Sequence, residues 1–139
     1  MKNQYNLKLE NFPFHHKINT RWRDLDAFRH VNNATFLSYI EDARIVFFKR
    51  WNINLKEKSL IVASVKIDYL QQLEHPSKMI IGQKVSRIGK KSFDILSAIF
   101  IEDIISPICC STVTSVCYDF INNKSVLVFD EIKNDYKNE

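Results

Sequence analysis

The stretch that decides the fold reads Arg21-Trp-Arg-Asp-Leu-Asp26-Ala-Phe-Arg-His30-Val-Asn-Asn33, and it runs directly into a mostly apolar segment over 34–51. Apolar and polar residues alternate from His15 to Asp24, which is typical of a half-buried strand. From Phe36 to Trp51 apolar residues recur at spacings of three and four, which predicts a long helix with a broad apolar face. The stretch therefore predicts a strand, a short polar loop and a helix.

The composition of the whole chain is that of one folded domain. Its 139 residues are 45% hydrophobic and 26% charged, which argues against disorder. The net charge of +4 is spread along the chain, which disfavours nucleic acid as the main partner and suits a ligand that carries phosphate. No run approaches the roughly 20 apolar residues of a membrane span, and no signal peptide is visible, so we expect a cytoplasmic protein.

The three cysteines, Cys109, Cys110 and Cys117, lie in one apolar run. Without a Cys-x-x-Cys pair or a nearby histidine they fit buried, reduced thiols better than a disulfide or a zinc site. We therefore expect no metal.

The second half of the chain is expected to form an antiparallel sheet. Four consecutive strands are predicted, over 60–69, 79–88, 92–101 and 108–118. Alternation in the first of them predicts one buried face, and the short connections imply antiparallel pairing. An α+β fold in which the sheet wraps one long central helix satisfies both patterns. We expect a single domain over 1–139, with a flexible arm over 1–13 and a frayed tail over 130–139.

Two motifs carry a resemblance to a known family. Asp-x-Asp-Ala-x-x-His-Val-Asn-Asn over 24–33, followed by Glu-Asp-Ala-Arg over 41–44, resembles hot-dog-fold acyl-CoA thioesterases of the 4-hydroxybenzoyl-CoA thioesterase-like family. The resemblance is densest from Thr20 to Arg50 and continues more loosely to about Tyr118. It implies a hot-dog fold, in which an antiparallel sheet wraps a central helix. It also implies hydrolysis of an acyl-CoA or acyl-carrier thioester by a homodimer or homotetramer with active sites at the subunit interface. No cofactor is expected, because coenzyme A is part of the substrate.

The same resemblance assigns the chemistry to Asp26, as nucleophile or as general base. Backbone N–H groups at the start of the helix lack partners and carry partial positive charge, so Asn32, Asn33 and Ala34 are the candidate oxyanion site. An asparagine at 32 or 33 also suits the N-cap. Asp24 is the rival carboxylate, which on an extended strand would point the same way as Asp26. A lone Asp before a helix more often caps a loop, and for Asp24 we favour that role.

Further candidates are weaker. The resemblance gives His30 the task of orienting or activating the nucleophile, and a loop-holding backbone hydrogen bond is the alternative. Glu41 matches a helical Glu used in another thioesterase branch, although an ion pair with a neighbouring cation is favoured. Arg87, Lys90 and Lys91 surround an expected hairpin turn, where they could contact the coenzyme A phosphates or form a solvated tip.

Two aromatic residues depart from the pattern of related enzymes. Phe28 and Trp22 stand where relatives have Asn and Tyr, and they suggest an apolar acyl pocket. Such departures leave open a second function, a non-catalytic module that binds acyl-CoA or acts as a regulator. A hydratase on the same fold is disfavoured, because its His and Gly pair after the strand and helix junction is missing.

Overall fold

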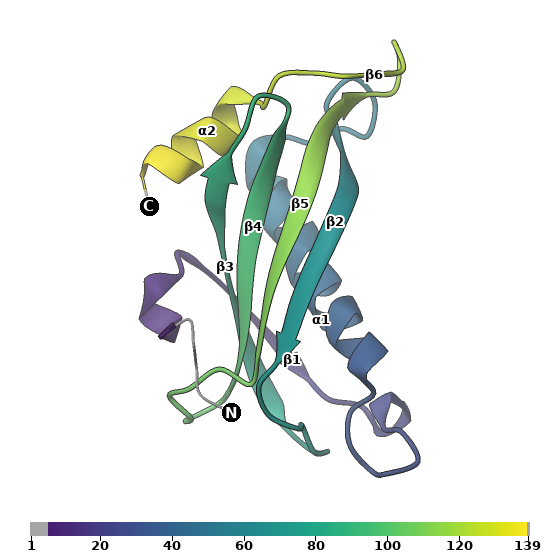
Figure 1. Cartoon of the computed structure of the whole chain (residues 1–139), viewed down its shortest axis with the longest axis vertical. Helices are drawn as coiled ribbons and strands as arrows, with labels where there is room; N and C mark the ends of the chain where they lie inside the picture. Colours follow the sequence, from purple (N-terminus) through teal and green to yellow (C-terminus); the bar gives the residue numbers. More distant parts are fainter. Residues whose placement is uncertain (1–5, 139) are drawn as a thin grey trace.

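The computed structural model of the chain describes residues 6–138 and has one curved sheet with one long helix against it (Figure 1). The elements are β1 (Phe14–Asn19), α1 (Asn33–Phe47), β2 (Ser59–Tyr69), β3 (Lys78–Ile88), β4 (Ser92–Ile101), β5 (Cys109–Asp119), β6 (Lys124–Ser125) and α2 (Asp130–Lys137). The strand order is β1-β3-β4-β5-β2, with β6 beside β5, and every pair is antiparallel. The predicted α+β fold, with antiparallel strands around a central helix, is confirmed.

Helix α1 forms where the three- and four-residue spacing predicted it. The side chain of Asn32 is its N-cap and accepts from the Ala34 N–H at 2.9 Å. The apolar face of α1 is buried against the sheet, and Phe36, Ile40 and Phe47 are at most 2% exposed. Burial of each such side chain stabilises the fold by about 1.5–3 kcal/mol, so the helix is held by packing rather than by its own propensity.

Strand β2 differs from the prediction of one buried face. It lies at the edge of the sheet, and Ile61, Val62 and Val65 are 38%, 44% and 45% exposed. The pairing of β2 with β5 also shifts by one residue between Val62 and Ser64, so the alternation of faces is interrupted there. Leu60 and Ile67, nearer the two ends of β2, are partly buried against the core, whereas Ile61, Val62 and Val65 remain open within one chain.

The strand predicted over 15–24 is too long. Strand β1 ends at Asn19, and a 3-10 helix, Trp22–Asp24, follows it. The Asp24 carboxylate accepts from the Arg21 N–H at 2.8 Å and so stabilises this turn. The alternation that suggested a longer strand thus loses to a local side-chain hydrogen bond.

The predicted N-terminal arm is anchored. Residues 1–5 lie outside the described residues, but Phe12 is 3% exposed and packs with Leu70 and Phe100. Its ring meets Phe100 edge-on, with centroids 6.3 Å apart. The segment before β1 is therefore docked on the sheet by the buried Phe12 ring, with Leu7 and Leu9 partly buried against the same cluster.

The frayed tail predicted over 130–139 is wrong for Asp130–Lys137, which forms helix α2. Ile132 is fully buried and packs in the same cluster as Phe47 and Trp51. The Trp51 indole N–H donates to Asp135. Ion pairs from Arg50 to Asp135 and from Lys58 to Glu131 also hold α2. The charged composition of the segment hides its one buried apolar residue. Within residues 6–138 no helix is long and apolar enough to cross a membrane.

Candidate functional site

The motif residues between β1 and α1 form a small hairpin-like loop. Asn32 N–H donates to the Asp24 carbonyl at 2.8 Å, and Asp26 N–H donates to the His30 carbonyl at 2.8 Å. Leu25 and Val31 form a bridge between these two bonds. Backbone bonding thus gives the loop a defined shape immediately before α1.

Asp26 sits near the tip of this loop with one carboxylate oxygen fixed. Its Oδ1 accepts from the Phe28 N–H at 2.8 Å and from the His30 N–H at 3.3 Å. Among residues 6–138, Oδ2 has no hydrogen-bond partner. The carboxylate is half-buried and held in orientation, and one oxygen is left for a ligand or a water molecule.

Asp26 lines an open hollow of about 470 Å³. The loop contributes Asp26, Phe28, His30 and Val31 to its wall. Helix α1 contributes Asn33 and Phe36, and the end of β2 with the residues after it contributes Tyr69, Leu70, Gln71 and Gln72. The structure therefore brings together three predicted site residues, Asp26, His30 and Asn33, on one surface with an apolar side.

Sequence reasoning missed the wall that comes from β2. The Tyr69 hydroxyl donates to the Asn33 carbonyl at 2.8 Å, and its ring lies 5.3 Å from that of Phe36, edge to face. Gln71 and Gln72 follow it. The end of a predicted strand was visible in the sequence, but only the folded topology places that end beside the start of α1.

The three N–H groups predicted as an oxyanion site have different partners. Asn32 N–H donates to the Asp24 carbonyl, and Ala34 N–H donates to the Asn32 side chain. Of the three, only the Asn33 N–H has no acceptor among the described residues. It lies in the first turn of α1, where the partial positive charge of a helix terminus is concentrated.

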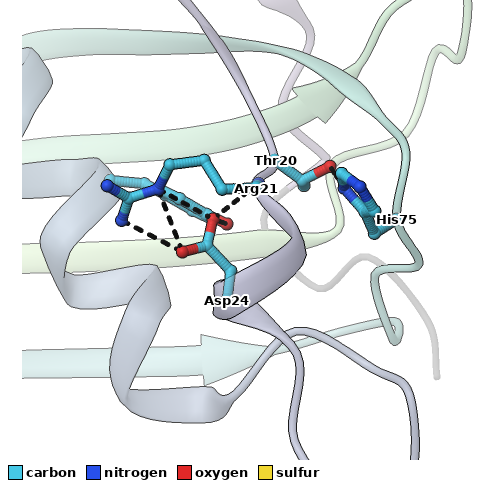
Figure 2. A network of polar contacts seen from close by, with 5 residues as sticks. Thr20, Arg21, Asp24 and His75 are labelled. Atoms are coloured by element: carbon cyan, nitrogen blue, oxygen red, sulfur yellow. Dashed lines mark hydrogen bonds and ion pairs between the residues drawn. The ribbon is translucent and has the colours of Figure 1, made fainter.

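The prediction that Asp24 and Asp26 point the same way is wrong. Asp24 is 3% exposed, and its carboxylate accepts from Arg21 and from the Tyr39 hydroxyl. Figure 2 shows the Arg21 guanidinium over this carboxylate, with Thr20 and His75 nearby. Burial alone would raise the pKa of Asp24, but hydrogen bonds from Tyr39 and Arg21 together lower it below its usual value. The Asp24 carboxylate therefore bonds within the protein and caps a turn, which is the role that the sequence favoured for it.

Three other candidates lie away from the hollow. Arg87 is bound to Asp94 through Nε at 2.9 Å and Nη2 at 3.1 Å. Lys90 and Lys91 follow on the hairpin between β3 and β4, which lies at the other end of the sheet from the 20–33 loop (Figure 1). Within one chain these cations therefore do not meet Asp26.

Trp22 and Glu41 also do not line the hollow. Trp22 is 77% exposed, and its ring lies edge-on to His75 at 6.3 Å, so only Phe28 of the two expected pocket aromatics is placed at the site. Glu41 is exposed on α1, 3.9 Å from Arg44, and this is the ion pair that the sequence favoured.

The cysteines are free and buried, as predicted. Burial raises the pKa of all three thiols, and it raises that of Cys110 to about 12. A thiol in this state is a poor nucleophile. Among residues 6–138 no group of three or more His, Cys, Asp or Glu side chains is placed to hold a metal ion.

The fold and the motif identify the class of protein. Residues 20–135 match the thioesterase-like superfamily, and the chain belongs to that family. The curved antiparallel sheet around α1 is the hot-dog fold that the sequence resemblance implied.

Several known proteins and solved structures are similar to this chain. The long-chain acyl-CoA thioesterase FadM of Escherichia coli (strain K12) is 23% identical over 122 residues, which are 84% of this chain and 92% of FadM. The uncharacterized protein YsmA of Bacillus subtilis (strain 168) is 34% identical over 87 residues, which are 61% of this chain and only 59% of YsmA. The PA5185 protein of Pseudomonas aeruginosa PAO1 shares the fold, with a TM-score of 0.85, 23% identity and 94% of each chain covered. A thioesterase of Thermus thermophilus, solved with coenzyme A and Zn, has a TM-score of 0.77 and 28% identity over 89% of this chain and 97% of its own.

Proposed function

We propose that the protein hydrolyses acyl-CoA thioesters to the free acid and coenzyme A, with Asp26 as the general base. The observation that carries this proposal is the half-buried Asp26 carboxylate, fixed at Oδ1 and open at Oδ2, in a hollow that Asn33 also lines. Family membership supports thioester chemistry. FadM acts on long-chain acyl-CoA, and the Thermus thioesterase binds coenzyme A, which supports this class of substrate.

The proposed reaction needs only a water molecule besides the thioester. Asp26 Oδ2 takes a proton from water as the water oxygen bonds to the carbonyl carbon. The Asn33 N–H donates to the developing oxyanion, which the helix terminus also stabilises. The C–S bond then breaks, the thiolate leaves, and the proton held on Asp26 goes to the sulfur. Coenzyme A enters only as part of the substrate.

His30, Asn32 and Ala34 have supporting roles in this proposal. The His30 side chain lines the hollow and is free to orient the attacking water, since its backbone already holds the loop. Asn32 caps α1 through Ala34. A turn of the Asn32 side chain would release the Ala34 N–H as a second oxyanion donor beside Asn33.

The acyl group is proposed to lie along the apolar side of the hollow. Val31 and Phe36 are buried at its inner wall, while Phe28 is 81% exposed at its edge. An exposed aromatic ring beside the opening gives apolar contact to an acyl chain that enters there. An acyl-carrier protein thioester is the other substrate to be tested.

We also propose that two copies join along β2 as a homodimer, on which a homotetramer would be built. β2 is an 11-residue edge strand with open apolar residues, and Val62 and Val65 line a groove against Leu37 of α1. Uncovered edge strands of this length bind further strands readily. In an antiparallel two-fold pairing, the Ser59 end of one β2 lies beside the Tyr69 end of the other, next to the hollow.

Such a dimer would also carry a distant part of the partner toward each site. Arg87, Lys90 and Lys91 belong to the end of β3 and the hairpin between β3 and β4. The two-fold axis moves this end of the sheet (Figure 1) toward the neighbouring site. We propose that these cations of the second copy contact the coenzyme A phosphates.

Val65→Lys should yield monomers in sedimentation velocity and lose turnover. Ile105→Lys, at a residue 77% exposed in a loop, is the control and should change neither. A Val65→Lys dimer with full activity would contradict the β2 interface.

The cytoplasm is the proposed compartment. Its support is chemical, because three buried cysteines that remain free suit a reducing environment.

A thiol-release assay across short, long and aromatic acyl-CoAs and an acyl-carrier thioester tests the function. Asp26→Asn should lower turnover by about 100-fold or more, the usual contribution of a general base. The control is Asp103→Asn, at an exposed loop position where φ is 68° and an asparagine fits equally well. If all substrates stay intact while acyl-CoA still binds, the protein is a binding module. An Asp26→Asn variant with near-normal turnover removes Asp26 from the reaction.

A single turnover in water labelled with oxygen-18 separates the two roles of Asp26. A general base predicts the label in the first acid released. Unlabelled acid in that turnover, with the label in the Asp26 carboxylate, identifies a nucleophile whose mixed anhydride is attacked by water at the aspartyl carbon. Attack of water at the acyl carbon of that anhydride gives labelled acid, so trapping of the anhydride by hydroxylamine completes the test.

A further inference from the structure

Asp24 is a buried carboxylate with an unusually complete set of partners for a residue outside the reaction. Its oxygens accept from the Arg21 backbone N–H at 2.8 Å, from Arg21 Nη2 at 3.0 Å and from the Tyr39 hydroxyl at 2.5 Å. A buried charge is costly unless it is satisfied in this way. Asp24 does not line the hollow. We therefore ask which part of the structure its hydrogen bonds hold in place.

The main chain of Asp24 is the base of the loop that carries Asp26. Its carbonyl accepts from the Asn32 N–H at 2.8 Å, which closes the loop just before α1 begins. Beyond this bond the loop is held by Leu25 opposite Val31 and by Asp26 N–H on the His30 carbonyl. Any shift of Asp24 would therefore move the whole loop relative to the helix.

The side chain of Asp24 sets that relation through Tyr39. Tyr39 is 1% exposed and belongs to α1, whose first turn carries the Asn33 N–H. The Asp24 carboxylate thus binds Arg21, which follows β1, and Tyr39 of α1. The backbone carbonyl of Asp24 accepts from the Asn32 N–H. Figure 2 shows how closely the Arg21 side of this cluster is packed around Asp24.

We infer that Asp24, bound by Tyr39 and Arg21, is a positioning residue that fixes the distance and orientation between Asp26 and the Asn33 N–H. The inference rests on the proposed thioesterase function. It assigns the two carboxylates of the motif different tasks: Asp26 meets the reacting atoms, and Asp24 sets where Asp26 stands. A misplacement of about 1 Å between reacting groups is enough to cost about 100-fold in rate.

Tyr39→Phe tests the inference, because it removes one hydroxyl and keeps the ring. Tyr136→Phe, on the exposed side of α2, is the matched control. In the thiol-release assay we expect kcat to fall at least tenfold while KM stays within twofold. Circular dichroism gives the amount of folded protein by which kcat is calculated. We also expect backbone amides over 24–34 to exchange at least tenfold faster, with β3 and β4 unchanged. Asp24→Asn, which keeps the shape and one acceptor, should recover part of the loss relative to Asp24→Ala.

The exchange data separate positioning from general stability and from the function itself. Faster exchange spread evenly over the sheet, or kcat within twofold of the natural protein, would overturn the inference. If the natural protein releases no thiol from any substrate, the thioesterase proposal fails. Exchange confined to 24–34 in Tyr39→Phe would still support the positioning role of Asp24, and unchanged exchange there would remove it.

Discussion

The contact between Gly82 and Phe12 gives a sharp test of how the N-terminal segment is anchored. A Cβ added at Gly82 would lie 2.6 Å from Cγ, 2.7 Å from Cδ2 and 2.8 Å from Cβ of Phe12. Ordinary contacts of this kind are about 3.5–4.0 Å, so Gly82→Ala must push the Phe12 ring by roughly 1 Å. Gly82 is in the middle of β3 and does not have positive φ, so alanine itself suits its backbone.

Two opposing terms set the expected size. Overpacking a fitted core site costs about 1–3 kcal/mol. Replacing glycine by alanine within a strand stabilises it by about 0.5–1 kcal/mol. Gly82→Ala should therefore lower the free energy of unfolding by about 1–2 kcal/mol, with a fall in Tm of roughly 3–6 °C for a domain of this size. In a Phe12→Ala background the clash is gone, and the same substitution should instead stabilise by roughly 0.5–1 kcal/mol.

Urea unfolding of the four proteins at one protein concentration measures this reversal of sign. The coupling between the two sites should be about 1–3 kcal/mol. If Gly82→Ala has the same effect with and without the Phe12 ring, the ring does not rest on Gly82 and the segment before β1 is not anchored as described. Thiol release should be unchanged throughout, because neither residue lines the hollow.

Two further predictions concern titratable groups. The pKa of Asp24 is lowered by folding, so its contribution to stability is complete above the usual pKa of about 4 and is lost as pH falls through the lower, folded value. Asp24→Asn should therefore be destabilised by about 1–3 kcal/mol at pH 7 in urea unfolding, with a gap that narrows below about pH 4; a gap that is constant with pH would contradict the charged hydrogen bonds. Because burial raises the pKa of the three thiols, a disulfide reagent should label none of them in the native protein and all of them in denaturant. Rapid labelling of the native protein would contradict their burial.

Periodicity predicted the central helix and strands β2 to β5 because these elements are long and carry regular apolar patterns. The ends of β2 to β5 fall within one residue of the predicted ranges. Helix α1 begins three residues before the predicted Phe36 and ends at Phe47, and a 3-10 helix, Phe48–Trp51, covers the rest of the predicted range. Periodicity did not predict which apolar faces are buried. β2 alternates like a covered strand but lies at the sheet edge, and its apolar residues are the ones we propose a second copy to cover.

The ends of the chain show a second limit of pattern reasoning. Phe12 and Ile132 are the buried apolar residues of two segments that read as polar and mobile. A single apolar residue has no period, so no periodic signal can reveal it. What it contacts depends on the folded sheet, through Gly82 for Phe12 and through Trp51 and Phe47 for Ile132.

For the site, the motif located the residues that lie on one short loop. Asp26, His30 and Asn33 are within eight positions, so local bonding alone brings them together. Tyr69 and Gln71 enter from the end of β2, more than thirty positions away, and their placement depends on the topology of the sheet. An N-cap at Asn32 was one of the two expected, but the sequence did not show that this cap would occupy the Ala34 N–H of the predicted oxyanion site. The bond from the Asn32 N–H to the Asp24 carbonyl was not predicted, because it depends on the turn at Asp24.

The spacing of two between Asp24 and Asp26 predicts a shared face only while the backbone is extended. The 3-10 turn at Trp22–Asp24 breaks that condition. The Arg21 N–H donates to the Asp24 carboxylate, and this hydrogen bond caps the turn and helps to hold Asp24 in its buried position. The two carboxylates therefore diverge for one local reason: the bond that turns the chain also takes Asp24 out of solvent. Asp26, two residues on, escapes the turn and keeps an oxygen free. A change that straightened this segment would pair the carboxylates, raise the pKa of one of them by repulsion and uncouple the loop from α1 at the same time.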